Sequence, residues 1–358
     1  MSRPTTRLLL PLLLLGCAHS DPFPSGDPGD NGPFNGPPPQ LLTLHLGQDR
    51  TPAWSPDGSR LLYSFNQVEL PDQDACLGAL PPAGGTRSLE HCRLGDTFHE
   101  LVEVREWPAL SPTGQLAWVE QENLVGVRVP TAGAIRVGTL SPLNPGIVVR
   151  SLPYTPPGGA LHLTATHLAW LGTDSLVYVG ADFLVTRACN GCKLDSLIVG
   201  REVIILDATT SPATTTVVPG TSGATAVAPA GAPGAIVYTL PGDGIVYRRQ
   251  LATGVVDSLW DFSATGIARD PALQGHRLVA VVGGNVTFTV DPLLGPVQQD
   301  AGGPLYVVNL ADSTVTAVSP GDHAARHPVF RPQQQAIVAE AVDTVPPFDP
   351  NLYLYLVP

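Results

Sequence analysis

The densest group of side chains that could bind a ligand lies near the C-terminal end of the sequence. Asp322, His323, Arg326 and His327 fall within one short segment, and imidazoles beside a carboxylate can bind a metal ion or an anionic group. We expect this segment to be a loop that enters a strand, where a spacing of four does not place both histidines on one face. A solvated polar loop is the competing interpretation, and the sequence favours it over a metal site.

Similar polar residues precede other apolar strands: Asp49 and Arg50, Arg105 and Glu106, His162 and His167, Arg269 and Asp270. If these strands converge on one axis, the residues that precede them meet at the mouth of a central channel, where a ligand could bind. The candidate binding residues at this mouth are Asp49, Arg50, Arg269, Asp270, Asp322, His323, Arg326 and His327.

Known catalytic signatures are missing from the sequence. It contains no G-x-S-x-G nucleophile elbow, no P-loop and no G-x-G-x-x-G after a strand. The segment from His99 to Glu103 lacks the second histidine of a zinc protease. We therefore assign no catalytic residue, no metal ligand and no cofactor, and the sequence favours a protein that is not an enzyme.

Four cysteines follow position 17 and form two pairs. Cys76 and Cys92 are equidistant from the centre of a hairpin around Pro81–Gly85, so they can face one another and form a disulfide. Cys189 and Cys192 enclose Asn-Gly, which is typical of a tight hairpin turn. A redox pair or half of a zinc site is the alternative for this second pair, but a disulfide is favoured.

The first 17 residues predict export. Arg3 and Arg7 precede an apolar run that is too short to cross a bilayer and is typical of a secretory signal. The run ends in Leu-Leu-Gly-Cys17, which resembles the lipobox of bacterial lipoproteins; that resemblance implies lipidation of Cys17. An ordinary signal peptide with an incidental cysteine is the alternative. Ala18 replaces the Asp that resembles an inner-membrane retention signal, so the outer membrane is favoured.

Residues 18–40 predict a disordered tether. This segment contains seven Pro and four Gly among 23 residues, with only Phe23 and Phe34 as large apolar side chains. Such a composition cannot form a core, and it would hold a folded domain clear of the membrane surface.

The composition of the whole chain predicts short strands joined by many turns. Gly and Pro number 37 and 38 in 358 residues, 43% of residues are hydrophobic and 14% are charged. This excludes a coiled coil or a charged disordered chain. The formal net charge of -12 argues against a nucleic-acid partner, which would require clustered Lys and Arg.

A repeated pattern of a turn followed by an apolar strand occupies residues 41–358. Pro52-Ala53-Trp54-Ser55-Pro56-Asp57-Gly58 contains a type I turn, and Trp107-Pro108-Ala109-Leu110-Ser111-Pro112-Thr113-Gly114 repeats it. Looser copies begin at His167 and Pro328. This repeated motif resembles the propeller repeat of the TolB-like family of bacterial envelope proteins. Six units of roughly 53 residues each match four-stranded propeller blades.

These features predict an all-β, six-bladed β-propeller of four-stranded antiparallel blades. The last unit lacks one strand, and Leu41–Leu46 supplies one too many, so we expect the N-terminal strand to complete the last blade.

Two functions remain open. The favoured one is an exported, lipid-anchored, non-catalytic scaffold that binds an envelope or extracellular protein and meets the membrane only through its lipid. The alternative is a propeller enzyme, or a carbohydrate-binding or small-ligand-binding protein, with its site at the channel mouth; this alternative rests on analogy of fold.

Overall fold

The computed structural model describes a folded unit that runs from Phe34 to Pro358. The described residues are 36–43, 47–66, 75–92, 101–124, 130–139, 146–152, 160–187, 194–210, 213–231, 234–283, 286–291, 295–300, 302–321, 323–342 and 350–357. None of these residues belongs to a helix that is long and apolar enough to cross a membrane.

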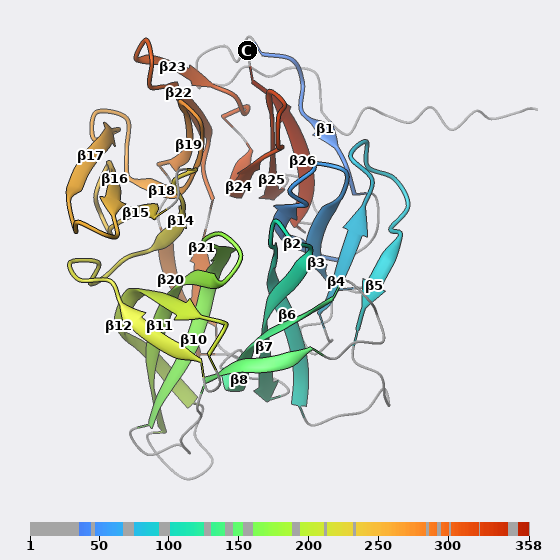
Figure 1. Ribbon diagram of the computed structural model, residues 1–358, viewed down its shortest axis with the longest axis vertical. Helices are drawn as coiled ribbons and strands as arrows, with labels where there is room; N and C mark the ends of the chain where they lie inside the picture. The colour runs from blue at the N-terminus through green and yellow to red at the C-terminus, as the bar shows by residue number, and fades with distance from the viewer. Residues whose placement is uncertain are drawn as a thin grey trace, which may run out of the picture. The chain divides into compact units, whose positions relative to one another are not determined.

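Within the described ranges the strands form six four-stranded antiparallel sheets, which are the blades of a propeller (Figure 1). The strands of each blade are given from the innermost outward. The first two blades are β2 (Asp49–Trp54), β3 (Leu61–Phe65), β4 (Cys76–Leu80), β5 (Leu89–His91), and β6 (Leu101–Leu110), β7 (Gln115–Leu124), β8 (Pro130–Thr139), β9 (Ile147–Leu152). The third and fourth are β10 (Ala160–Trp170), β11 (Ser175–Arg187), β12 (Leu194–Asp207), β13 (Thr214–Val217), and β14 (Ala226–Pro229), β15 (Ala235–Thr239), β16 (Ile245–Gln250), β17 (Val256–Asp261). The fifth and sixth are β18 (Ala268–Gln274), β19 (Arg277–Val282), β22 (Leu305–Asn309), β23 (Thr314–Ala317), and β24 (Ala324–Phe330), β25 (Ala336–Val342), β26 (Pro350–Leu356), β1 (Gln40–Leu41). A further hairpin, β20 (Val286–Asp291) and β21 (Gly295–Asp300), is inserted in the fifth blade between β19 and β22.

The innermost strands of the blades form a closed ring. Each of β2, β6, β10, β14, β18 and β24 contacts the next, and β24 contacts β2. Figure 1 shows the six sheets around this common axis. The six-bladed propeller that the sequence predicts is therefore confirmed.

The ring closes through the N-terminal strand, as expected. Strand β1 pairs antiparallel with β26, with Gln40 opposite Leu354 and Leu41 opposite Tyr353. The contact continues beyond the strand, because Leu42 N donates to Leu352 O over 2.8 Å. The regular strand is shorter than the predicted Leu41–Leu46, and residues 44–46 lie outside the described residues.

The apolar core lies between neighbouring blades. Second strands are deeply buried, and all five residues of both β3 and β15 are buried. One core cluster joins the first and last blades through Trp54 and Tyr63 on one side and Leu42 and Leu352 on the other. Burial on both faces explains why these strands are continuous apolar runs instead of alternating ones.

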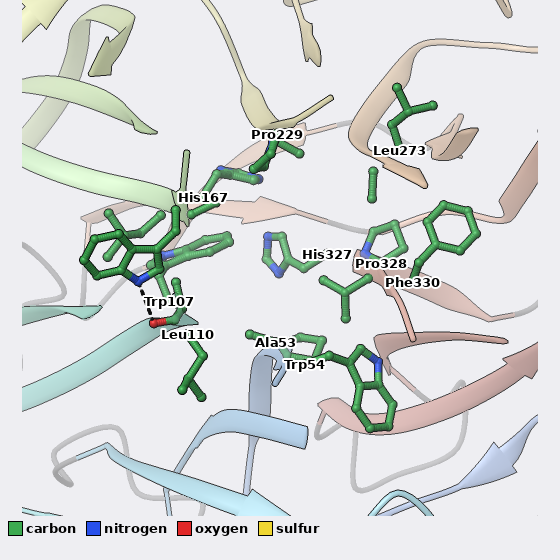
Figure 2. Close-up of a pocket in the computed structure, with 18 of the residues that line it drawn as sticks. Ala53, Trp54, Trp107, Leu110, His167, Pro229, Leu273, His327, Pro328 and Phe330 are labelled. Carbon is green, nitrogen blue, oxygen red and sulfur yellow. Dashed lines mark hydrogen bonds between the residues drawn. The ribbon is translucent and has the colours of Figure 1, made fainter. Parts of the chain in front are cut away.

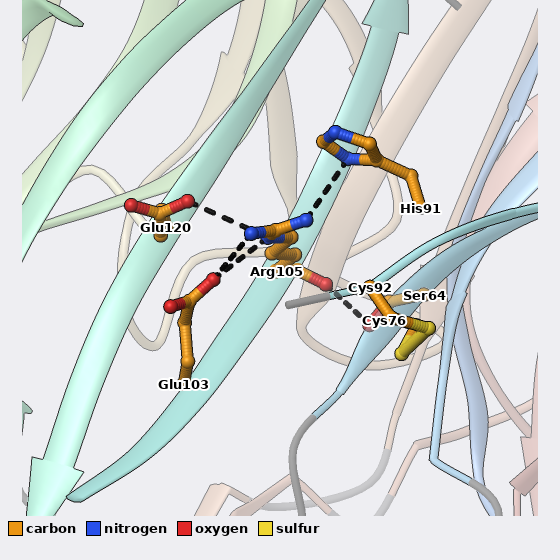
Figure 3. The surroundings of a disulfide bond; sticks show 7 residues. All are labelled: Ser64, Cys76, His91, Cys92, Glu103, Arg105 and Glu120. Atoms are coloured by element: carbon orange, nitrogen blue, oxygen red, sulfur yellow. Dashed lines mark hydrogen bonds and ion pairs between the residues drawn. A yellow bond between two sulfur atoms is a disulfide. The ribbon is translucent and has the colours of Figure 1, made fainter. Parts of the chain in front are cut away.

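A disulfide joins Cys76 on β4 to Cys92, which follows β5 (Figure 3). This bond confirms one of the two predicted pairs. Cys189 and Cys192, which form the other pair, lie outside the described residues, as does Cys17.

A buried charged cluster lies next to the disulfide (Figure 3). Arg105 Nε donates to Glu103 Oε1 over 2.9 Å and lies 3.4 Å from Glu120 Oε2. Its Nη1 lies 3.2 Å from His91 Nδ1. These contacts fix the Arg105 side chain within the second blade. Arg105, which the sequence placed among the polar residues of the channel mouth, therefore has a structural role.

Candidate binding site in the central channel

Five of the six innermost strands contain a β-bulge at the same place. Their registers shift between Arg50 and Ala53 and at the corresponding points of β6, β10, β18 and β24. Each bulge contains one residue with a left-handed backbone conformation. These residues and their φ angles are Thr51 (48°), Trp107 (56°), His167 (56°), Asp270 (46°) and His327 (49°).

This conformation is unusual for residues other than glycine, and it costs on the order of 1–3 kcal/mol at each position. The bulge interrupts the alternation of side chains along the strand. All five residues line one cavity at the channel axis, so the bulges bring five blades together at a single site. The fourth blade differs, since β14 pairs with β15 without a register shift.

The cavity has a volume of about 420 Å³ and is lined by residues of all six blades (Figure 2). Its walls are mainly apolar. They include prolines and small residues beside Trp54, Trp170, Leu273 and Phe330. A volume of this size suits a drug-sized molecule, and apolar walls with a few polar groups are typical of small-molecule sites.

The polar floor of the cavity is formed by His167, Asp270 and His327. His167 Nε2 lies 3.1 Å from Asp270 Oδ1. The backbone N–H of His327 donates to Asp270 Oδ2 over 3.2 Å. The indole of Trp107 lies against both imidazoles, with ring centroids 4.4 Å from His167 and 4.6 Å from His327. Figure 2 shows the two histidines and Trp107 converging from different blades.

A second, fully buried carboxylate, that of Glu340 on β25, lies next to the floor. Glu340 Oε2 accepts the backbone N–H of Thr51 over 2.9 Å and lies 3.0 Å from His327 Nδ1. Glu340 Oε1 lies 2.8 Å from Arg326 Nε. Glu340 therefore connects the first blade to the last and orients the His327 ring.

The charges at the floor are set by burial and by these neighbours. Burial alone would lower the pKa of His327, but Glu340 and Asp270 outweigh it and raise this pKa to about 9. Burial alone would raise the pKa of Asp270, yet His327 and His167 hold it well below its usual range. The pKa of Glu340 is likewise low, because Arg326 and His327 outweigh burial. At neutral pH His327 is therefore a cation between two carboxylates.

Several candidates from the sequence lie near this floor, but away from the cavity. Arg50 lies 3.7 Å from Glu106 Oε1, and burial raises the pKa of the Glu106 carboxyl although Arg50 opposes it. Arg269 Nη2 donates to the carbonyl oxygens of Gly283 and Gly302 over 2.9 and 2.8 Å. Asp49 is buried at the start of β2, opposite Phe65.

The structure separates the two histidines that are four apart in the sequence. His323 is buried, and its Nδ1 lies 3.2 Å from the hydroxyl of Tyr355, away from the floor. His327 lines the cavity. Asp322 lies outside the described residues, and His162 is part of β10.

Sequence reasoning did not assign a site role to Thr51, Trp107 or Glu340. A signal for the first two was present in the sequence. In four blades the left-handed residue is followed by proline, as at Thr51-Pro52 and Trp107-Pro108. Aligning the repeats on that proline would have placed Thr51, Trp107, Asp270 and His327 at equivalent positions.

Comparison with known proteins supports the fold alone. No family model matches the chain, and no curated protein matches it in sequence. The structure is similar to that of the calcium-binding protein regucalcin from Agrobacterium tumefaciens, with a TM-score of 0.53 and 10% identity over 90% of this chain and 93% of the other. It is also similar to a gluconolactonase from Xanthomonas campestris, with a TM-score of 0.52 and 13% identity over 91% and 96%.

A putative TolB from Agrobacterium tumefaciens is a weaker structural match, with a TM-score of 0.45 and 14% identity over 87% of this chain and 91% of the other. The calcium-binding protein and the gluconolactonase thus share the fold of this chain. The fold and the cavity together define this chain as a six-bladed β-propeller with a ligand-sized site on its axis.

Proposed function

We propose that the chain is an exported, lipid-anchored propeller that binds a small molecule in its central cavity. The observation that carries this proposal is the cavity itself, whose apolar wall from six blades ends in a floor of two imidazoles and a carboxylate. A ligand that complements this shape has an apolar or aromatic body and one polar end that forms hydrogen bonds with the floor. This proposal adopts the binding alternative from the sequence.

Ligand binding can be followed through intrinsic fluorescence. Three of the five tryptophans, Trp54, Trp107 and Trp170, line the cavity. We expect members of a small-molecule library that has apolar bodies and polar ends to change this fluorescence saturably. Ala272, on the cavity wall, would be replaced by Phe to reduce the space. Ala311→Phe, an exposed position of the same blade, serves as the control.

Ala272→Phe should abolish saturable binding, whereas Ala311→Phe should bind as the wild type does. A library that produces no saturable change in the wild type, or hits that bind Ala272→Phe equally well, would contradict the proposed cavity ligand.

Export and anchoring rest on the sequence around Cys17. The lipid would hold the propeller at the outer membrane, and residues 18–40 would separate the two. A Cys17→Ser variant, expressed in a diderm bacterium, should move from the membrane fraction to the soluble fraction. If it partitions as the wild type does, the anchor assignment fails, whatever the cavity binds.

A protein-interaction scaffold remains a second candidate, because the outermost strands expose apolar side chains. On β9, Ile147 is 68% and Val148 is 47% exposed, and Val217 and Val315 are also exposed on their outer strands. Such positions can contribute to contact with an envelope protein. Affinity purification from the native envelope should recover a partner with the wild type, and an Ile147→Ser, Val148→Thr double variant should lose it. Equal recovery would count against this surface.

A further inference from the structure

The three polar residues of the cavity floor have the composition and spacing of a metal site. One candidate ligand atom from each of His167, Asp270 and His327 lies within 4.8 Å of the other two. The His167 Nε2 to Asp270 Oδ1 distance is 3.1 Å, and His327 Nε2 lies 3.9 Å from Asp270 Oδ2. Ligands at ~2.0–2.2 Å from one ion lie roughly 3–3.5 Å apart. The pair of His167 and Asp270 already has this separation, and the other separations, which are at most 4.8 Å, need to shorten.

The other nitrogen of each imidazole has an oxygen atom beside it. His167 Nδ1 lies 3.1 Å from Thr166 Oγ1, and His327 Nδ1 lies 3.0 Å from Glu340 Oε2. Metal-binding histidines usually have this arrangement, because a partner on one nitrogen orients the ring and leaves the other nitrogen toward the ion. Here the nitrogens that remain, the two Nε2 atoms, are those that lie near Asp270.

The guanidinium groups of the nearby arginines contact other groups. Arg269 precedes Asp270, but its Nη2 donates to two backbone carbonyls. Arg326 forms its ion pair with Glu340, and Arg50 lies near Glu106. The negative charge of Asp270 therefore faces the two imidazoles, and an ion placed among them would meet a carboxylate.

We propose that His167, Asp270 and His327 bind one divalent transition-metal ion at the floor of the cavity. The ion displaces the proton on His327 Nε2, which is released to solvent, because a histidine must be neutral to bind a metal. Two imidazole nitrogens and one carboxylate suit Zn²⁺, Co²⁺, Fe²⁺ or Ni²⁺, whereas Ca²⁺ and Mg²⁺ prefer oxygen ligands. Three protein ligands leave at least one coordination position open, and all three residues line the cavity. The open position is thus accessible to water or to a small molecule.

Co²⁺ alone is the probe that tests this site. The mature chain, freed of metal with a chelator, would be titrated with Co²⁺ while its visible absorption is recorded. We expect one Co²⁺ per chain, with absorption bands typical of mixed nitrogen and oxygen ligands. Removing a group that only orients a metal ligand typically costs about 10–100-fold in affinity, so His167→Gln, Asp270→Asn and His327→Gln should each cost at least that much. His276→Gln is the control, because His276 is an exposed histidine of the fifth blade; it should bind as the wild type does.

A measurement on the wild type removes any dependence on the folding of the variants. Paramagnetic Co²⁺ should broaden the imidazole NMR signals of His167 and His327, and leave those of His276 sharp. The proposal is overturned if the wild type binds no stoichiometric Co²⁺, if the broadened signals belong to other histidines, or if the three variants bind as tightly as the wild type. The titration contains no organic ligand, so its failure would leave the proposed cavity ligand untouched.

Discussion

Beneath the cavity floor, Arg326 and Glu340 form an ion pair whose carboxylate is almost inaccessible to solvent. The Nε to Oε1 distance is 2.8 Å, and the exposed fraction of the Glu340 side chain is 1%. Removing one partner of a buried pair leaves an uncompensated charge, which typically costs about 3–5 kcal/mol. Glu340 would keep the cationic His327 beside it, so we expect Arg326→Met to lower the free energy of unfolding by less than this, about 1.5–3 kcal/mol, as measured by urea denaturation.

Arg248→Met is the matched control, because it removes an arginine from an exposed ion pair. Arg248 Nη2 lies 3.1 Å from Asp257 Oδ2, but the two side chains are 39% and 45% exposed. An exposed pair contributes about 0–1 kcal/mol, so this variant should be close to the wild type. Equal losses in the two variants would show that the buried pair adds no more stability than a surface pair.

At the scale of single residues the sequence identified part of the site. Asp270 and His327 were among the candidate binding residues, and His167 was noted among the polar residues ahead of other apolar strands, because such residues converge in a propeller. Their joint geometry could not be predicted, because it depends on β-bulges in which each of these residues adopts a left-handed backbone conformation. Glu340 was missed since it lies on a second strand, where the sequence indicates only core packing.

The turn after each innermost strand sets the register between that strand and the second strand of its blade. The turn of the second blade is closed by Gly114, whose N–H donates to Ser111 O over 2.9 Å and whose φ is +85°. A Cβ at this position would contact nothing within 4 Å, so a substitution changes only the backbone preference. Gly114→Ala should destabilise the protein by roughly 1 kcal/mol in thermal or urea unfolding.

Gly200→Ala tests the same substitution where the backbone is compatible. Gly200, on β12, has no left-handed φ, and an added Cβ would meet Asp182 Oδ2 at an ordinary 3.7 Å. Alanine there should stabilise the protein by about 0.4–1 kcal/mol, because it restricts the unfolded chain. The two alanine variants should therefore change the free energy of unfolding in opposite directions. Changes in the same direction would contradict this explanation.

The elements themselves were largely predictable from local chemistry. Ser-Pro-Asp-Gly and Ser-Pro-Thr-Gly predicted the turns after β2 and β6, and the apolar segments that follow these turns predicted the buried second strands. The fourth blade could not be aligned as well, because Val227-Ala228-Pro229 has no polar residue and no bulge at this position. Within the described residues the predicted N-terminal strand ends at Leu41, since its apolar residues indicate a strand but not where its hydrogen bonds end.

At the scale of the whole molecule, β1 joins the last blade to the first. Leu42 N donates to Leu352 O over 2.8 Å, and Leu352 N donates to Thr43 Oγ1 over 3.0 Å. Leu42 O also accepts the N–H of Gly85, in the turn between β4 and β5 of the first blade, over 3.3 Å. The segment 40–43 therefore contacts both blades that meet at the closure of the ring.

Truncation at two neighbouring points tests this closure. Deletion of residues 1–36 leaves the segment intact, whereas deletion of residues 1–43 removes Leu42, which is 1% exposed. Loss of a buried leucine, of the three hydrogen bonds made by Leu42 and Thr43 and of the β1–β26 pairing should cost at least about 3–5 kcal/mol. It also uncovers the edge of β26, and an unpaired edge favours association between chains. The longer deletion should melt at a lower temperature and form oligomers in size-exclusion chromatography, whereas the shorter one should match the wild type. If both truncated chains melt together and stay equally monomeric, the N-terminal strand does not hold the ring closed.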